Sequence, residues 1–401
     1  MIKISSKNKT IYGSIDLESS KSISNRLLII KELCKTKFEI QNLSNAKDTK
    51  ILNELLDSFN KRIDLNCEDA GTALRFLIAF LATKDGIWKV SGSKRMHERP
   101  VKPLIDCLKE LGAEIKYLEK EGFPPIEIKS KKLSLLGDIS SQFISALLLV
   151  APTIENGLTL EITSKVLSKP YIAMTLGLMS DFGIEYSWEN NIIKVEQQNY
   201  LAKNIEVEND WSAASFWYSF LALSKSGEIK IPNLYANSLQ GDSVLSSIYL
   251  KLGIKTEFNE DSIVLYKTKN IAKELELDLS NHPDLALPII VTCCGLGIKA
   301  HLMGLESLKV KESNRLECIK KELKKFNVSC EIDSSSIIVK ENQKIVQPNT
   351  IIECHNDHRI AMSIAPLSMK VDSIKFDDKE VVNKSYPKFW EDFNRASKNN
   401  N

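Results

Sequence analysis

The feature that most constrains the fold is a repeat of about 70 residues along the chain. Polar segments typical of helix starts run into long apolar stretches at six places, near Ser20, Gly71, Ser140, Asp210, Asp284 and Asp357. A second marker recurs at a similar interval, because amphipathic segments end at Gly112, Gly183, Gly253, Asn327 and Asn394. Glycine and asparagine adopt the left-handed conformation that closes many helices. Two markers with one period predict about six copies of a unit that holds two helices and several strands.

One helix of each unit is expected to be buried. The segments 76–81, 146–151 and 216–223 are apolar nearly all round, whereas the partner segments carry a single apolar stripe. Buried helices that begin with polar groups are expected to direct their backbone N–H groups toward a shared place. At this point the alternative is a repeat scaffold with ordinary helix caps.

Composition narrows the class of protein. A chain of 401 residues is long enough for two well-packed domains. The formal charge of +2, without a long basic block, gives no support for nucleic-acid binding. No apolar run reaches the ~18 to 20 residues of a membrane span, and Met1 leads into a strand-like segment rather than a signal peptide. Eight cysteines without metal-type spacing are typical of free thiols in a cytoplasmic protein without a bound metal.

Cations gather at the expected element starts. The segment 19–26 places two cations at the start of a helix, where free N–H groups and the helix dipole favour an anion. Nine such cations occur along the chain: Lys21, Arg26, Arg75, Arg95, Arg99, Lys311, Arg315, Arg359 and Lys384. Interspersed acids are few, chiefly Asp284, Glu312 and Asp357. Each cluster alone is typical of a solvated helix end, but the whole pattern predicts small polyanionic ligands and acids reserved for proton transfer.

The segment 309–315 carries a charge triplet that is typical of a solvated helix face. In such a helix Lys311 and Arg315 would lie one turn apart on one face, with Glu312 beside them.

Ten collinear segments resemble one known family across essentially the whole chain. They read SKSISNR, DAGTALR, RMHERP, SSQF, SKPY, NSLQGD, HPDLAL, VKESNRL, NDHRIAM and KSYPKFW. In this order they resemble the enolpyruvyl transferase family, and within it the members that act on shikimate 3-phosphate. The resemblance implies an α/β fold of two domains, each an inside-out barrel of three βαβαββ-type repeats. Residues 21–209 would form one domain and 1–20 with 210–401 the other, with the active site in the cleft between them.

The resemblance also implies a reaction. The enolpyruvyl group of phosphoenolpyruvate would pass to the 5-hydroxyl of shikimate 3-phosphate, with release of phosphate, on the route to chorismate and the aromatic amino acids. Neither a metal nor an organic cofactor is implied. The enzyme is expected to be a cytoplasmic monomer without nucleic-acid or membrane partners, and to be a target of glyphosate.

The family's site residues carry over position by position. Shikimate 3-phosphate would contact Lys21, Ser22, Arg26, Ser140, Ser141, Gln142, Ser168, Asp284, Ser307 and Lys311. Phosphoenolpyruvate would contact Lys21, Gly71, Arg95, Gln142, Arg315, Arg359 and Lys384. Asp284 would accept the hydroxyl proton. Glu312 or Lys21 would protonate the methylene carbon and remove a proton again when phosphate leaves.

The chain departs from the family pattern at three places. Glu18-Ser19 replace a Pro-Gly pair, Glu68-Asp69 replace Gly-Asn, and Ser307 stands at a position that often holds asparagine. Extra acids near an anion site are expected to change affinity and the response to glyphosate, while leaving the reaction class unchanged.

Two rival functions are disfavoured. The sister enzyme acting on UDP-N-acetylglucosamine has a catalytic cysteine five residues before the arginine of an Arg-Pro pair, and Lys94 occupies that position here. A non-catalytic scaffold that binds anions would not require both Asp284 and Glu312 beside Lys21 and Arg359.

Overall fold

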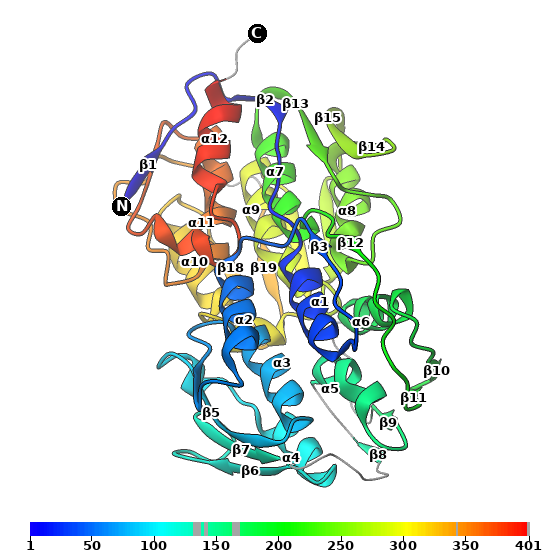
Figure 1. Cartoon of the computed structure of the whole chain (residues 1–401). Helices are drawn as coiled ribbons and strands as arrows, with labels where there is room; N and C mark the ends of the chain where they lie inside the picture. The colour runs from blue at the N-terminus through cyan, green and yellow to red at the C-terminus, as the bar shows by residue number, and fades with distance from the viewer. Residues whose placement is uncertain (131–137, 140–142, 163–168, 342–343, 399–401) are drawn as a thin grey trace. The chain divides into compact units, whose positions relative to one another are not determined.

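The chain was analysed as a computed structural model, which describes residues 1–130, 138–139, 143–162, 169–341 and 344–398. The chain divides into two compact units (Figure 1). Ser20–Val207 form one, the N-terminal unit, and Met1–Ser19 with Glu208–Asn401 form the other, the C-terminal unit. None of the described helices is long and apolar enough to cross a membrane.

The N-terminal unit alternates helices and short strands. Its elements are α1 (Lys21–Leu33), β3 (Ile40–Gln41), α2 (Lys47–Ser58), β4 (Asp64–Asn66), α3 (Gly71–Ala82), β5 (Gly86–Ser91), η1 (Met96–Glu98), α4 (Lys102–Glu110), β6 (Glu114–Tyr117), β7 (Ile126–Ser130), β8 (Asp138–Ile139), α5 (Ile144–Val150), η2 (Ala151–Thr153), β9 (Leu158–Glu161), α6 (Lys169–Asp181), β10 (Ser187–Glu189), β11 (Ile192–Val195) and β12 (Ile205–Glu206).

The C-terminal unit is built in the same way. Its elements are β1 (Ile2–Ile4), β2 (Thr10–Ser14), α7 (Trp211–Leu223), β13 (Ser226–Pro232), η3 (Gly241–Val244), α8 (Leu245–Lys251), β14 (Leu252–Phe258), β15 (Ser262–Ile271), β16 (Glu274–Asp278), η4 (Pro283–Leu285), α9 (Ala286–Leu296), β17 (Lys299–Met303), η5 (Glu306–Val310), α10 (Arg315–Lys324), β18 (Cys330–Ile332), β19 (Ile337–Val339), α11 (His358–Ile364), η6 (Ala365–Met369), β20 (Ile374–Phe376), η7 (Glu380–Lys384) and α12 (Phe389–Lys398).

The sheets repeat one connectivity. Three four-stranded sheets have the orders β4-β5-β7-β6, β8-β9-β11-β10 and β16-β17-β19-β18. In each sheet the first two strands are parallel, across a helix, and the remaining pairings are antiparallel. The expected α/β repeat with βαβαββ connectivity is therefore confirmed.

The N-terminal strands complete sheets of the C-terminal unit. Strand β2 lies parallel to β13 in the sheet β2-β13-β15-β14, and the blue ribbon of β2 runs beside the green ribbon of β13 (Figure 1). Strand β1 pairs antiparallel with β20. Strand β2 occupies the place beside β13 that β4, β8 and β16 occupy in their own sheets.

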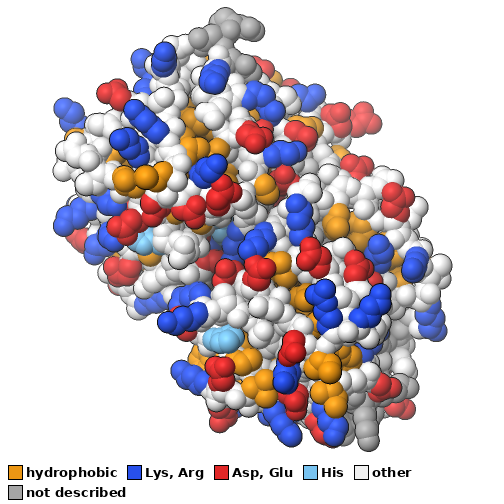
Figure 2. Space-filling view, turned by 60° about the vertical axis from the view of Figure 1, so that its left-hand side comes forward, with side chains coloured by type: hydrophobic (Ala, Val, Ile, Leu, Met, Phe, Trp, Pro, Cys, Tyr) orange, Lys and Arg blue, Asp and Glu red, His pale blue; other side chains and the backbone are white. Residues whose placement is uncertain are grey.

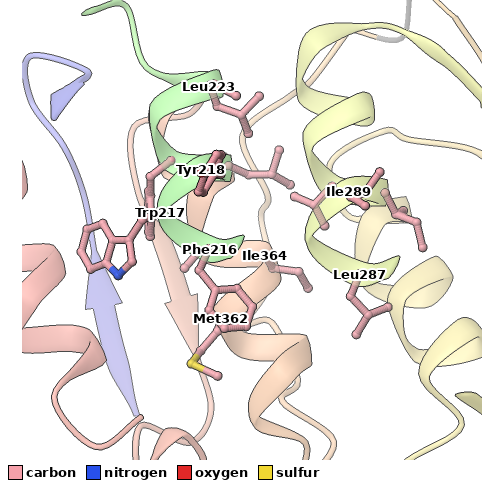
Figure 3. Close-up of a cluster of buried hydrophobic side chains, with 14 of the residues drawn as sticks. Phe216, Trp217, Tyr218, Leu223, Leu287, Ile289, Met362 and Ile364 are labelled. Atoms are coloured by element: carbon pink, nitrogen blue, oxygen red, sulfur yellow. The ribbon is translucent and has the colours of Figure 1, made fainter. Parts of the chain in front are cut away.

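The helices expected to be buried are buried. Every residue of α7 except Ser212 is buried, and α9 and α11 pack against it with apolar side chains such as Leu287, Ile289, Met362 and Ile364 (Figure 3). The N-terminal unit has a separate core that includes most of α3 and α5. Full burial of each large apolar side chain contributes roughly 1.5 to 3 kcal/mol to folding, which explains why these segments become the centres of the two units.

Most of the expected helix ends are confirmed. Gly112, Gly183, Gly253 and Asn327 have φ values of 96°, 81°, 84° and 64°, the left-handed conformation that reverses the chain after a helix. The expectation for Asn394 was wrong, because α12 continues past it to Lys398. The buried stripe of α12 also continues past Asn394, which lies on the exposed face where a weak helix former costs little.

Candidate active site

The first anion-site candidate is the start of α1. The Ser20 hydroxyl caps this helix by accepting from the Ile23 N–H at 3.4 Å. Lys21, the first helical residue, is partly exposed, and its Nζ lies 3.1 Å from the buried carboxylate of Asp48 in the first turn of α2. Ser22 follows on the same turn and is half-buried. Lys21 is thus held in place by an acid that the sequence analysis did not include among the site residues.

Arg26 is buried one turn further along α1. Its guanidinium donates to Thr175 Oγ1 at 2.8 Å, to the Ser22 carbonyl at 2.8 Å, and to the Ser145 hydroxyl and the Tyr171 carbonyl at 3.3 Å. All four acceptors are neutral. Burial therefore lowers the pKa of Arg26 to about 10, since no carboxylate among these acceptors offsets the loss of water.

Gly71 opens α3 against a guanidinium. A Cβ atom at Gly71 would lie 2.5 Å from Arg99 Nη1 and 2.8 Å from its Cζ. Arg75, one turn into the helix, donates to the Gly71 carbonyl at 3.0 Å and lies over the Phe143 ring at 5.0 Å. The bare backbone of Gly71 therefore makes room for Arg99, a cation that motif matching did not place in the site.

The remaining N-terminal positions are more exposed or lie outside the described residues. Arg95 precedes η1 and pairs with Glu98 at 2.7 Å, both partly exposed. Four expected ligands of shikimate 3-phosphate fall outside the described residues, namely Ser140, Ser141, Gln142 and Ser168.

The extra acids at positions 68 and 69 have partners within the N-terminal unit. Glu68 adopts a left-handed backbone conformation with φ 46° and pairs with Lys47. Asp69 accepts a hydrogen bond from the Ser93 hydroxyl. These contacts partly offset the negative charge that the sequence analysis expected near phosphoenolpyruvate.

In the C-terminal unit, Arg315 joins three carboxylates that come from different segments. Its Nε donates to Asp357 Oδ2 at 2.8 Å, its Nη1 to Asp284 Oδ1 at 3.1 Å, and its Nη2 to Glu312 Oε2 at 2.8 Å. The Ser313 hydroxyl also donates to Asp357, at 3.0 Å. The Arg315 side chain is only 2% exposed, so these bonds are shielded from water. We call Arg315 and these three acids the arginine cluster.

Further cations surround the arginine cluster. Arg359 Nη2 lies 3.3 Å from Asp284 Oδ2, and its Nη1 donates to the Asp284 carbonyl at 2.8 Å. Lys311 Nζ lies 3.8 Å from Asp284, and Lys384 Nζ lies 3.1 Å from Glu312 Oε1. The structure therefore brings together six of the seven expected site residues of this unit; Ser307 lies nearby in sequence, half-buried on η5.

The charges of the cluster shift its titration strongly. Burial alone would raise the pKa of Asp284, but the nearby cations Arg359, Lys311 and Arg315 outweigh it and hold the pKa well below its usual value. Burial likewise acts to lower the pKa of Arg315, and the carboxylates of Asp357, Glu312 and Asp284 reverse the shift and raise it. Asp284 is consequently a weak base as long as these cations surround it.

The expected helical geometry of the 311–315 segment was wrong. Lys311 has an extended backbone, φ −79° and ψ −158°, and α10 begins only at Arg315. The reason is a contact between distant segments, because the Ser313 hydroxyl and Arg315 Nε both bond to Asp357. Lys311 and Arg315 still meet at one acid, Asp284, although they are not neighbours on a helix face.

Asp357 stands among the interspersed acids of the sequence but not among the expected site residues. Its carboxylate caps α11 by accepting from the Arg359 N–H at 3.0 Å and also accepts from Arg315. It is fully buried. The signal was available in the NDHRIAM segment, where an N-cap aspartate directly precedes a cation of the site.

One set of side chains among the described residues has metal-ligand potential. Ligand atoms of Glu322, Glu353 and His355 lie within 4.8 Å of one another. However, Lys325 lies 2.7 Å from Glu322 and Lys321 lies 2.8 Å from Glu353, so ammonium groups already contact both carboxylates. We assign no metal to this set.

Chemically, the arginine cluster and its surrounding cations combine two abilities. Guanidinium and ammonium groups bind carboxylates and phosphates, and Asp284 and Glu312 offer two carboxylates at 19% and 14% exposure for proton transfer. This combination suits addition and elimination at an anionic substrate.

Comparisons with known proteins agree with this chemistry. The family model described as EPSP synthase (3-phosphoshikimate 1-carboxyvinyltransferase) matches residues 57–393. A 3-phosphoshikimate 1-carboxyvinyltransferase of Bacteroides fragilis is 41% identical over 393 residues, covering 96% of this chain and 95% of the relative. A relative of the same description from Histophilus somni is 31% identical over 424 residues, covering 97% of each chain.

Solved structures show the same fold. An EPSP synthase from Acinetobacter baumannii superposes with a TM-score of 0.79 at 20% identity, covering 98% of this chain and 97% of that chain. The enolpyruvyl transferase NikO from Streptomyces tendae superposes with a TM-score of 0.77 at 12% identity, covering 98% and 96%. At these identities the likeness concerns the fold alone. Together with the family model and the relatives that are 31% and 41% identical, it shows that this chain belongs to the EPSP synthase (3-phosphoshikimate 1-carboxyvinyltransferase) family.

Proposed function

We propose that the protein transfers the enolpyruvyl group of phosphoenolpyruvate to the 5-hydroxyl of shikimate 3-phosphate and releases phosphate. Family membership supports the substrates and the reaction. The observation that carries the chemistry is the arginine cluster, where Asp284 and Glu312 share one buried guanidinium and are flanked by Arg359, Lys311 and Lys384.

The reaction divides into addition and elimination. In the addition, the 5-oxygen of the acceptor bonds to C2 of phosphoenolpyruvate, its proton passes to Asp284, and a proton from Glu312 or Lys21 converts the C3 methylene into a methyl group. In the elimination, C3 returns a proton to Glu312 or Lys21, and phosphate leaves C2 and takes up the proton held by Asp284, so that the enol ether forms. Every proton supplied in the first step is thereby balanced in the second.

Substrate binding would also raise the basicity of Asp284. Its carboxylate now faces Arg359, Lys311 and Arg315, which keep its pKa low. An anionic ligand that binds to these cations competes with Asp284 for them, so the pKa of Asp284 rises when the ligand is bound. The same competition applies to Glu312, whose two oxygens contact Arg315 and Lys384. Base strength would thus depend on occupancy by the substrate.

We assign the ligands as the family pattern implies. Shikimate 3-phosphate would bind to Lys21, Ser22, Arg26, Ser140, Ser141, Gln142, Ser168, Asp284, Ser307 and Lys311. Phosphoenolpyruvate would bind to Lys21, Gly71, Arg95, Gln142, Arg315, Arg359 and Lys384. Both units would contribute to one site in a cleft between them, in a cytoplasmic monomer. Small-angle scattering with and without shikimate 3-phosphate tests this arrangement, since a ligand that bridges the units should reduce the radius of gyration.

A phosphate-release assay tests the reaction. Purified protein is supplied with phosphoenolpyruvate and either shikimate 3-phosphate or UDP-N-acetylglucosamine. Release with shikimate 3-phosphate alone is the expected result. Release with the nucleotide sugar alone, or with neither acceptor, would contradict the proposal.

A further inference from the structure

A second buried carboxylate, Glu322, lies on α10 two turns beyond Arg315. Its side chain is completely buried. Its Oε1 lies 3.0 Å from His355 Nε2, while its Oε2 accepts from the Glu353 N–H at 3.0 Å and lies 2.7 Å from Lys325 Nζ. Two of these three partners belong to the segment just before α11. Glu322 therefore connects α10 to the turn that leads into α11.

That turn has an unfavourable backbone. His355 and Asn356 both adopt positive φ values, 54° and 53°, one directly after the other. The left-handed conformation costs about 1 to 2 kcal/mol for a residue with a side chain, so the turn requires support from elsewhere. The bonds from Glu322 supply it on one side, and Asp377 supplies it on the other by accepting from the Cys354 N–H at 2.9 Å.

The turn also sets the position of site residues. The Asp357 N–H donates to the Cys354 carbonyl at 2.9 Å, so Asp357 follows wherever the turn lies. Asp357 in turn bonds to Arg315 and caps the helix that carries Arg359. Helix α10 is thus joined to the start of α11 at two points, by Arg315 with Asp357 and by Glu322 with His355 and Glu353.

We infer that Glu322 and His355 are positioning residues, which hold the left-handed turn so that Asp357 and Arg359 keep the geometry needed to bind the anionic donor. The inference rests on the proposed function for the identity of that donor. It differs from a simple stabilising role, because a buried ion pair is weak evidence for stability and better suited to fixing one arrangement.

Three variants test the inference. Glu322→Gln keeps the volume and removes the charge that faces His355 and Lys325. His355→Asn removes the imidazole, while asparagine tolerates the left-handed backbone. Glu317→Gln is the matched control, because it removes the same charge from an exposed position of α10.

The kinetic readout is the KM for each substrate. A small misplacement of binding groups can cost up to about 100-fold, so we expect Glu322→Gln to raise the KM for phosphoenolpyruvate about tenfold and His355→Asn about threefold. The KM for shikimate 3-phosphate should stay within about twofold of the control. A purely structural role would lower the melting temperature without this selective change, and equal KM values for phosphoenolpyruvate in all three variants would overturn the inference.

Hydrogen exchange gives a readout that does not depend on the reaction. Amides of residues 355–360 should exchange faster in Glu322→Gln and His355→Asn than in Glu317→Gln. Unchanged exchange there would also overturn the inference, even if the wild-type protein proves inactive with shikimate 3-phosphate. If Glu322→Gln fails to fold, His355→Asn decides alone. Failure of the wild-type assay, by contrast, would contradict only the proposed function.

Discussion

Two buried arginines, one in each unit, solve opposite electrostatic problems. Arg26 on α1 donates to neutral hydroxyl and carbonyl groups, and burial lowers its pKa to about 10. Arg315 on α10 is equally buried, but its three carboxylate partners raise its pKa above the usual value. The two side chains have the same chemistry and similar exposure, 3% for Arg26 and 2% for Arg315.

The difference indicates how each arginine would respond to an anion. Arg26 is a buried charge held by dipoles, so a nearby phosphate would add a favourable interaction without replacing an acid. Arg315 is already neutralised, and a ligand that approaches it must compete with Asp284 or Glu312. Only the second arrangement would couple the binding of an anion to the protonation of the acids that contact the arginine. On the surface, Lys and Arg side chains are interspersed with Asp and Glu side chains over the face shown in Figure 2.

The largest expected effect comes from removing each guanidinium. Arg315→Met leaves three carboxylates without their shared partner, and breaking a buried pair in this way typically costs about 3 to 5 kcal/mol of unfolding free energy. Arg26→Met leaves only neutral acceptors, whose unmade hydrogen bonds cost about 1 to 3 kcal/mol. Urea unfolding of both variants measures the contrast. Equal losses would show that the two environments do not differ as described.

Asp284→Ala tests the acid of the arginine cluster that is proposed to accept the hydroxyl proton. Loss of a general base typically lowers turnover by about 100-fold or more, and we expect this effect with shikimate 3-phosphate binding changed by less than about tenfold. Glu306→Gln, on the exposed part of η5, is the control. Steady-state kinetics and a binding titration provide the measurement. Near-normal turnover in the alanine variant would remove Asp284 from the mechanism.

Gly71→Ala tests another guanidinium of the N-terminal unit, that of Arg99, which lies against the backbone of Gly71. The added methyl group would collide with the Arg99 guanidinium, which must move out of its place against the backbone. We expect a higher KM for phosphoenolpyruvate and little change for shikimate 3-phosphate. Glyphosate should lose the most affinity, because it is longer than phosphoenolpyruvate. Steric exclusion on this scale is worth about 1 to 3 kcal/mol, or roughly 10- to 200-fold.

A melting curve distinguishes steric exclusion of the ligand from an effect on the backbone at Gly71. If Gly71 serves only the local backbone, alanine should lower the melting temperature and affect both substrates alike. Arg99→Lys offers a second check, because a smaller head group should reduce the collision in the double variant.

The smallest expected effect is a pH dependence of stability. Since the pKa of Asp284 is lowered in the folded protein, its ionised form stabilises the fold above its usual pKa of about 4, and this contribution is lost as the pH falls below that value. The stability difference between the wild type and Asp284→Asn should therefore be largest near neutral pH and shrink toward about pH 2. Urea unfolding across this range, with Asp261→Asn as an exposed control, measures it. A difference independent of pH would contradict the assigned ion pairs.

Local signals explain what could be predicted from the sequence. The repeat, the buried helices and the left-handed ends at Gly112 and Asn327 each depend on residues close together in the chain. Asn394 failed because the same residue type can lie on an exposed helix face, and only the surrounding apolar stripe distinguishes the two cases.

The pairing of residues in the arginine cluster could be identified only from the folded structure. Asp284, Arg315 and Asp357 come from three segments, and the motifs indicated their residue types but not their pairing. The same holds for Arg99 against Gly71, where the contact joins the start of one helix to the loop before another. Motif matching also could not show that Lys311 is extended, because its conformation follows from bonds that neighbouring residues make to Asp357.

The most direct test of the account is to run the transfer in deuterium oxide and to measure the mass of the product. If C3 of phosphoenolpyruvate is protonated to a methyl group and then loses a proton, solvent deuterium must enter the enol ether formed on shikimate 3-phosphate. We predict a product that carries deuterium at this carbon, together with one phosphate released for each product formed. An enol ether without deuterium would contradict addition and elimination through the acids of the arginine cluster, and the absence of any enol ether would contradict the proposed function itself.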